Sequence, residues 1–282
     1  MVERRSWFTF WAHLTLILGV VAICFPLYVA LVASTHPLPL LLQGRLPLLP
    51  GDWALANYSA VLGAGVGAAG MPPAGVMLLN SLVMALGICI GKIAISIVAA
   101  YAIVYFRFPL RMTCFWLIFI TLMLPVEVRI QPTYQVVADL HLLDSYAGLI
   151  VPLIASATAT FLFRQFFLTV PGELAEAARI DGAGPLRFLW HILLPLSRNS
   201  IAALFVIQFI YGWNQYLWPL MVTTKQSYYT VVMSISRMVN AVDVAPSWNL
   251  IMATAVLAMI PPVIVVLAMQ RWFVKGLVET EK

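Results

Sequence analysis

Long apolar runs alternate with short polar segments along this chain, and charged residues fall almost entirely between the runs. A membrane-spanning helix needs about 20 mainly apolar residues to cross roughly 30 Å of hydrocarbon. The pattern predicts spans over residues 13–34, 76–106, 112–126, 145–167, 200–222 and 250–271. We expect helices because a bilayer offers no water to satisfy free backbone groups. The sequence therefore predicts an all-α integral membrane protein with six spans in one transmembrane domain, residues 1–282.

The first apolar run follows Arg4 and Arg5, as the apolar core of a secretory signal would. It continues to about Ala33, whereas the core of a signal peptide has about 7–15 residues. An uncleaved anchor is therefore predicted, with cleavage near Ala33 as the alternative.

Basic residues predict the orientation of the spans. With a cytoplasmic N-terminus, eleven lysines and arginines fall on the cytoplasmic side and four on the other. This bias follows the positive-inside rule and predicts that both termini lie inside. The outer connections are then 35–75, 127–144 and 223–249, and the long inner one is 168–199. An irregular loop and a folded cap are both open for residues 35–75.

Composition supports the membrane assignment and narrows the partners. Hydrophobic residues make up 62% of the chain, charged residues only 10%, and the mean hydropathy is +0.96. Soluble domains carry about 25% charged residues, so the bilayer is the expected surrounding of this chain. The net charge of +5 comes from residues that flank apolar runs, which argues against nucleic acid as a partner.

Sequence patterns for catalysis and metal binding are missing. Gly91-Lys92 does not belong to a GxxxxGK[ST] phosphate loop, and neither HExxH nor GxSxG occurs. The three cysteines form no CxxC pair. We therefore predict no catalytic residue, no metal site, no bound cofactor and no ATP hydrolysis by this chain itself.

The positions of proline and glycine in the inner connection 168–199 predict a pair of short helices. Pro171 suits the first turn of a helix, whereas Gly182 and Gly184 break it. Pro185 then starts a second helix, which we expect to end before Pro195. Chemistry alone leaves two interpretations open: an amphipathic connector on the membrane surface, or an elbow that docks into another protein.

A motif in this connection resembles one found in a known family. Glu176, Ala177 and Ala178 are followed at fixed spacing by Gly182 and by Ile192, Leu194 and Pro195. This pattern is similar to EAA-x₃-G-x₉-I-x-L-P, the motif of permease subunits in bacterial ATP-binding-cassette importers. The resemblance implies that the elbow docks on an ATPase subunit and that these seven residues couple ATP hydrolysis to transport.

The resemblance extends over most of the chain. The segments 119–130, 143–149, 157–167, 209–219 and 276–282 are similar to permeases of sn-glycerol-3-phosphate importers, within the maltose-type carbohydrate group. It implies the type I importer permease fold in the bacterial inner membrane. It also implies a second permease in a heterodimer, two ATPase subunits that hold ATP and Mg, and a periplasmic solute-binding protein. A different cargo (a glycerophosphodiester or another carbohydrate) and a secondary transporter are the alternatives.

Polar residues inside the predicted spans are candidates for a translocation path. Asn214 and Gln215 lie beside Trp218 in the fifth predicted span, and Lys92 lies in the second. Asn214 and Gln215 either line a wet path, tie helices together or mark the outer interface, and these interpretations stay open. Lys92 is interpreted as a paired or snorkelling lysine, with a role in the path of an anionic phosphate as the alternative. Arg129 and Glu127 are interpreted as an ordinary ion pair, with a gate contact as the alternative. Gly87-x-x-x-Gly91 predicts a face for close helix contact.

Overall fold

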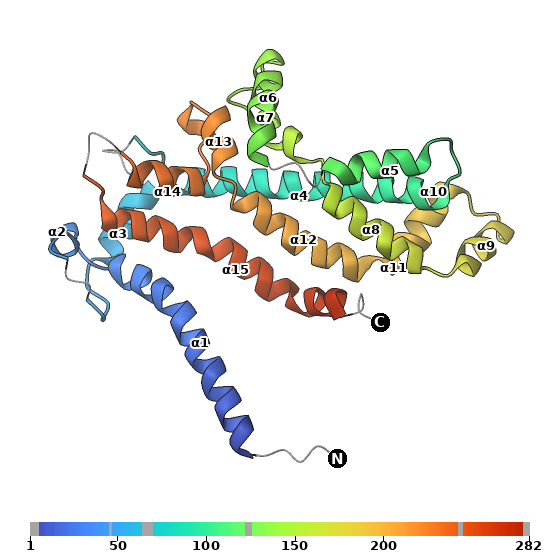
Figure 1. Cartoon of the computed structure of the whole chain (residues 1–282). Helices are drawn as coiled ribbons and strands as arrows, with labels where there is room; N and C mark the ends of the chain where they lie inside the picture. Colours follow the sequence, from blue (N-terminus) through green and yellow to red (C-terminus); the bar gives the residue numbers. More distant parts are fainter. Residues whose placement is uncertain (1–5, 45–46, 64–69, 122–125, 242–244, 279–282) are drawn as a thin grey trace. The chain divides into compact units, whose positions relative to one another are not determined.

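The computed structural model describes residues 6–44, 47–63, 70–121, 126–241 and 245–278, and over these ranges it contains helices and no strand (Figure 1). Two compact units form. Unit 1 consists of Met1–Gly75 and Ser234–Ile260, and unit 2 of Val76–Met233 and Pro261–Lys282. The single domain predicted over residues 1–282 stays a prediction.

Three long helices coincide with three of the predicted spans and are candidate spans. They are α1 (Ser6–Ala33), α4 (Ala74–Tyr105) and α15 (Trp248–Val278). Each contains a run that is long and apolar enough to cross a bilayer. These runs were predictable because nothing in them interrupts the helix strongly enough to outweigh about 20 apolar residues.

The fourth predicted span is a bent pair of helices. It comprises α7 (Tyr146–Ile150), the 3₁₀ turn η3 (Val151–Leu153) and α8 (Ala157–Thr169), with a 48° bend. Pro152 lies in η3 and has no N–H to continue the helix. Ser156 then caps α8 by accepting a 3.2 Å hydrogen bond from the backbone N–H of Ala159.

The fifth predicted span, a continuous helix over 200–222, is wrong. Helix α12 covers Arg198–Trp213, and a separate helix α13 covers Leu217–Val222. In a continuous helix the Pro219 ring would clash with the carbonyl of Gln215, which would also lose its hydrogen-bond donor. A new start at Leu217 places Pro219 in the first turn, where the missing N–H has no consequence.

The third predicted span is only partly described. Helix α5 (Arg111–Ile120) has ten residues, α6 (Val126–Asp139) follows it, and residues 122–125 lie outside the described part of the chain. By length and apolar composition, the described helices supply three spans, or up to five if each bent pair counts as one. Six spans with both ends inside therefore remain a prediction.

Unit 1 shows that the first outer connection is folded over much of its length. It contains α2 (Leu38–Leu42) and α3 (Ala54–Gly63). The buried amide of Asn57 donates 2.8 and 2.9 Å hydrogen bonds to the carbonyls of Ser34 and His36. Its Oδ1 accepts a 2.8 Å bond from Asn249. These bonds tie α3 to the end of α1, so the folded alternative holds for the described residues of this connection.

Unit 2 is built around α4. The predicted small-residue face is confirmed, because an added Cβ on Gly87 would meet Ile150 at 2.7 Å and one on Gly91 would meet Ile154 at 2.5 Å. Helix α12 approaches α4 as closely, since a Cβ on Gly212 would lie 2.9 Å from the Cα of Ala85. The unit also contains η5 (Gln226–Tyr228) and the first turn of α14 (Val231–Val239).

Candidate functional site

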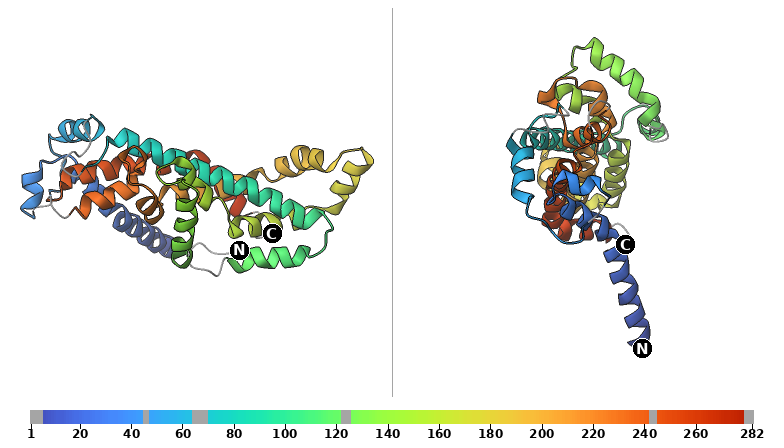
Figure 2. Two further views of the ribbon diagram at one scale, coloured as in Figure 1. Left: turned by 90° about the horizontal axis from the view of Figure 1, so that it is seen from above. Right: turned by 90° about the vertical axis from the view of Figure 1, so that its left-hand side faces the viewer.

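The inner connection forms an elbow of short helices. Its elements are α9 (Gly172–Ile180), α10 (Pro185–Phe188), a π-helical turn (Leu189–Leu193) and α11 (Leu194–Leu196). In Figure 1 and in the left view of Figure 2, the yellow α9–α10 segment lies at the end of unit 2 that also holds the C-terminal end of α4. We call Gly172–Leu196 the elbow.

A glycine turn ends α9. Gly182 has φ +73°. Its N–H donates a 3.0 Å hydrogen bond to the carbonyl of Arg179, and the N–H of Ala183 donates a 2.8 Å hydrogen bond to the carbonyl of Ala178. These two bonds define a Schellman motif, whose left-handed residue is most often glycine. Ala178 is buried beneath this turn, whereas Glu176 and Ala177 are exposed. The predicted break at Gly182 and the restart at Pro185 are confirmed.

The predicted end of the second helix before Pro195 is wrong. Helical structure continues to Leu196 through the π turn. In an uninterrupted α-helix the Pro195 ring would clash with the carbonyl of His191, and the wider π turn removes this clash. Ile192 and Leu194 are half-buried here, and Pro195 is exposed.

The exposed surface of the elbow is unusually apolar for a segment outside the predicted spans. Ile180 is 86% exposed, Leu186 71% and Trp190 65%. Exposed charged side chains, among them Asp181 and Arg187, lie between these apolar ones, which does not suit burial in lipid. A mixed surface of this kind is typical of a protein–protein contact.

Four aromatic residues fasten the elbow to α4 and α8 within unit 2. The Phe188 ring lies 5.2 Å from that of Tyr105 and 6.4 Å from that of Tyr101. The Tyr101 hydroxyl donates a 2.8 Å hydrogen bond to the carbonyl of Pro185, and Phe167 of α8 packs against Tyr105. The sequence interpretation missed this aromatic anchor, although Tyr101 and Tyr105, one turn apart near the end of a span, were a usable signal.

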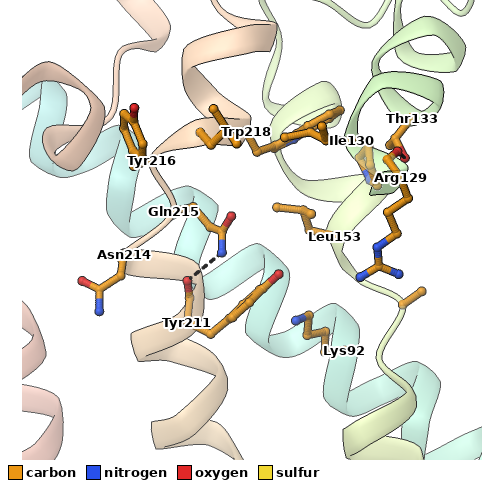
Figure 3. Close-up of a pocket in the computed structure, with 13 residues that line it drawn as sticks. Lys92, Arg129, Ile130, Thr133, Leu153, Tyr211, Asn214, Gln215, Tyr216 and Trp218 are labelled. Carbon is orange, nitrogen blue, oxygen red and sulfur yellow. Dashed lines mark hydrogen bonds between the residues drawn. The ribbon is translucent and has the colours of Figure 1, made fainter. Parts of the chain in front are cut away.

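A pocket lined by both polar and apolar side chains lies between α4, α6, α12 and α13 (Figure 3), with a volume of about 360 Å³. All four predicted path residues line it: Lys92, Asn214, Gln215 and Trp218. The Gln215 amide donates a 3.2 Å bond to the carbonyl of Tyr211. Asn214 is exposed at the broken end of α12, and in Figure 3 its side chain points away from Lys92. That these residues line the translocation path stays a prediction.

Trp218 also stabilises the pocket wall. Its indole is 4% exposed and donates a 3.1 Å hydrogen bond to the carbonyl of Gly148 in α7. The ring packs in a core cluster with Met84, Leu149 and Val222. Trp218 therefore ties α13 to α7.

We expect Trp218→Phe to lower the free energy of unfolding by about 1–2 kcal/mol, because the buried Gly148 carbonyl loses its donor. The midpoint of thermal unfolding of the detergent-solubilised protein measures this change. Trp116→Phe, at a half-exposed ring of α5, is the matched control with little expected effect. An unchanged midpoint in Trp218→Phe would contradict the structural role.

Two connections outside the predicted spans meet at Asp144, which follows α6. Its carboxylate accepts hydrogen bonds from the N–H and hydroxyl of Thr224, both at 2.6 Å, and from the N–H of Lys225 at 2.8 Å. Partial burial opposes ionisation, but these hydrogen bonds outweigh it and hold the pKa of Asp144 below its ordinary value. The ionised carboxylate thus joins the segment that follows α6 to the segment that follows α13. Helix α6 itself carries Arg129.

Comparisons with known proteins agree on one family. Residues 92–279 match the family described as "Binding-protein-dependent transport system inner membrane component". Proteins named "sn-glycerol-3-phosphate transport system permease protein UgpE" are similar over all 282 residues and over their own full length. Those of Agrobacterium fabrum and Yersinia pestis are 58% identical to this chain, and that of Rhizobium meliloti is 57% identical.

One solved structure shows the same fold. It is titled "Crystal structure of a bacterial ABC transporter involved in the import of the acidic polysaccharide alginate". The match covers 97% of this chain and 99% of the other, with a TM-score of 0.82 and 22% identity. At this identity the comparison shows the fold alone, and it confirms the expected permease fold.

Proposed function

Because this chain belongs to the family of binding-protein-dependent inner membrane transport components, we propose that it is the permease subunit of an importer for sn-glycerol-3-phosphate. The observation that carries this proposal is the 58% identity to permeases of that name over all 282 residues. The chain is a multi-pass inner membrane protein, and its role is transport.

We further propose that the elbow is the docking surface for one of two ATPase subunits. The exposed apolar residues Ile180, Leu186 and Trp190 support this assignment, as does the match of Glu176 to Pro195 with the coupling motif. ATP and Mg bind to the ATPase subunits in this proposal, and the present chain hydrolyses nothing. A second permease completes the pore, and a periplasmic binding protein delivers the cargo.

A secondary transporter is the main alternative in a different class. Such a protein would move its cargo without ATPase subunits and would have no use for a docking elbow. The Schellman turn at Gly182 and the aromatic anchor at Phe188 hold the elbow in one conformation, which favours a docking function.

The cargo is tested by reconstituting the complete complex in proteoliposomes with its binding protein. We expect sn-glycerol-3-phosphate to stimulate ATP hydrolysis and to be taken up, whereas maltose does neither. Glycerophosphocholine is the second candidate cargo, because it carries the same glycerol phosphate group. Stimulation by maltose alone would overturn the proposed cargo, and uptake without ATP would favour the secondary transporter.

A further inference from the structure

Lys92 holds a buried positive charge in the middle of a membrane-spanning helix. The side chain is 6% exposed, and its ammonium lies 3.5 Å from the centre of the Tyr211 ring. Among the described side chains, no carboxylate lines either of the pockets that Lys92 borders. A charge inside a span is costly and is typically retained for a function. The ring stabilises the cation but does not neutralise it.

A second cation, Arg129, borders the same pockets as Lys92. Arg129 of α6 lines the same two pockets as Lys92, and it lies near enough to interact electrostatically with the lysine. Figure 3 shows Arg129 reaching from α6 toward the part of the pocket where Lys92 lies. The sequence suggested an ion pair between Arg129 and Glu127, but the Glu127 side chain lies outside the described part of the chain. Two like charges at one cavity repel each other unless an anion lies between them.

Neighbouring groups suit a small polyol. The two pockets have volumes of about 360 and 560 Å³, within the range of roughly 300–1,000 Å³ typical of small-molecule sites. Besides the cations, their linings hold amides and hydroxyls, among them Gln215 and Thr133. These groups supply hydrogen bonds for hydroxyls next to a site for negative charge.

We propose that Lys92 and Arg129 form a phosphate subsite inside this permease and make it selective for anionic cargo. The inference rests on the proposed function and deepens it, because it assigns cargo recognition to this subunit. A phosphomonoester carries a charge of about −1.5 to −2 at pH 7, which two cations neutralise. A phosphodiester carries a single negative charge and needs only one of them. The pair therefore favours glycerol phosphate over its diesters.

The test uses the complete reconstituted complex with Lys92→Met and Arg129→Gln. We expect each variant to lower uptake of sn-glycerol-3-phosphate about tenfold or more, since each removes a charge-assisted contact with the phosphate. Uptake of glycerophosphocholine should fall less, which changes the ratio between the two cargoes. Lys92→Arg, which keeps the charge, should retain most of the uptake. Arg107→Gln, at an exposed arginine that borders neither pocket, is the matched control.

Thermal unfolding without cargo separates the subsite from a structural lysine. A lysine kept for an anion leaves its charge unneutralised in the empty pocket, so Lys92→Met should unfold at the same temperature or higher. Lower stability with equal loss of both cargoes would overturn the inference, as would uptake of sn-glycerol-3-phosphate within twofold of wild type. If the wild-type complex does not take up this cargo, the proposed function itself fails, and that result is distinct from a failure of the subsite alone.

Discussion

Replacing Gly182 by aspartate should lower solute uptake about tenfold or more while the permease remains folded and assembled with its ATPase subunits. A coupling free energy of about 1–3 kcal/mol between two sites corresponds to roughly 5–150-fold, so loss of a docking contact gives an effect of this size. Apart from its chain neighbours, nothing in the described part of the chain lies within 4 Å of an added Cβ at Gly182. Aspartate also tolerates the left-handed conformation better than most residues. The turn therefore persists, and a carboxylate now projects from the docking surface.

Three measurements on one preparation follow this effect: subunit composition after purification, ATP hydrolysis stimulated by loaded binding protein, and uptake. Hydrolysis should no longer be coupled to uptake. Gly182→Asn separates added charge from added bulk, since it fits the turn as well. Gly44→Asp places the same charge at another left-handed glycine, with φ +70° and nothing near an added Cβ, and it should change uptake less than twofold because it lies outside the elbow. Normal uptake in Gly182→Asp would contradict a coupling role for the elbow.

The elbow illustrates how far local sequence determines structure. Pro171, Gly182 and Pro185 act through their own backbone geometry, so the start and end of α9 and the start of α10 were predictable. The continuation of the helix past Pro195 was not, because it depends on a π turn that no residue preference announces. The aromatic anchor was missed for a different reason, since Phe188 and Tyr101 are far apart in the sequence.

The pocket also depends on contacts between residues far apart in the sequence, which local patterns do not predict. Hydropathy identified Lys92 as an unusual residue in a span, but its neighbours Tyr211 and Arg129 come from α12 and α6. Arg129 was interpreted from its sequence neighbour Glu127, whereas the fold brings it to Lys92. The break between α12 and α13 was also missed, although Asn214, Gln215 and Pro219 were signals, because the apolar residues on both sides outweigh them in the hydropathy of 200–222.

Gly148→Ala should be the most damaging of the small substitutions in unit 2. A Cβ at this position would overlap the backbone oxygen of Leu142, which is unable to rotate away as a side chain would. Two further contacts depend on the same residue: its N–H donates to the Ser145 hydroxyl at 3.0 Å, and its carbonyl accepts from Trp218. Overpacking costs about 1–3 kcal/mol, and each hydrogen bond about 1 kcal/mol more. We expect a loss of about 3 kcal/mol or more, seen as low yield and early unfolding in detergent.

Alanine substitutions at two other glycines should cost less stability than Gly148→Ala. An added Cβ on Gly87 would meet only the side chain of Ile150, so Gly87→Ala should cost about 1 kcal/mol or less. Gly19 of α1 has nothing within 4 Å, so Gly19→Ala should be neutral or slightly stabilising through helix propensity. The order Gly148, Gly87, Gly19 follows what each added methyl group would contact. If all three variants unfolded together, the close approach of α7 to Leu142 would be wrong, and with it the wall that holds Trp218 at the pocket.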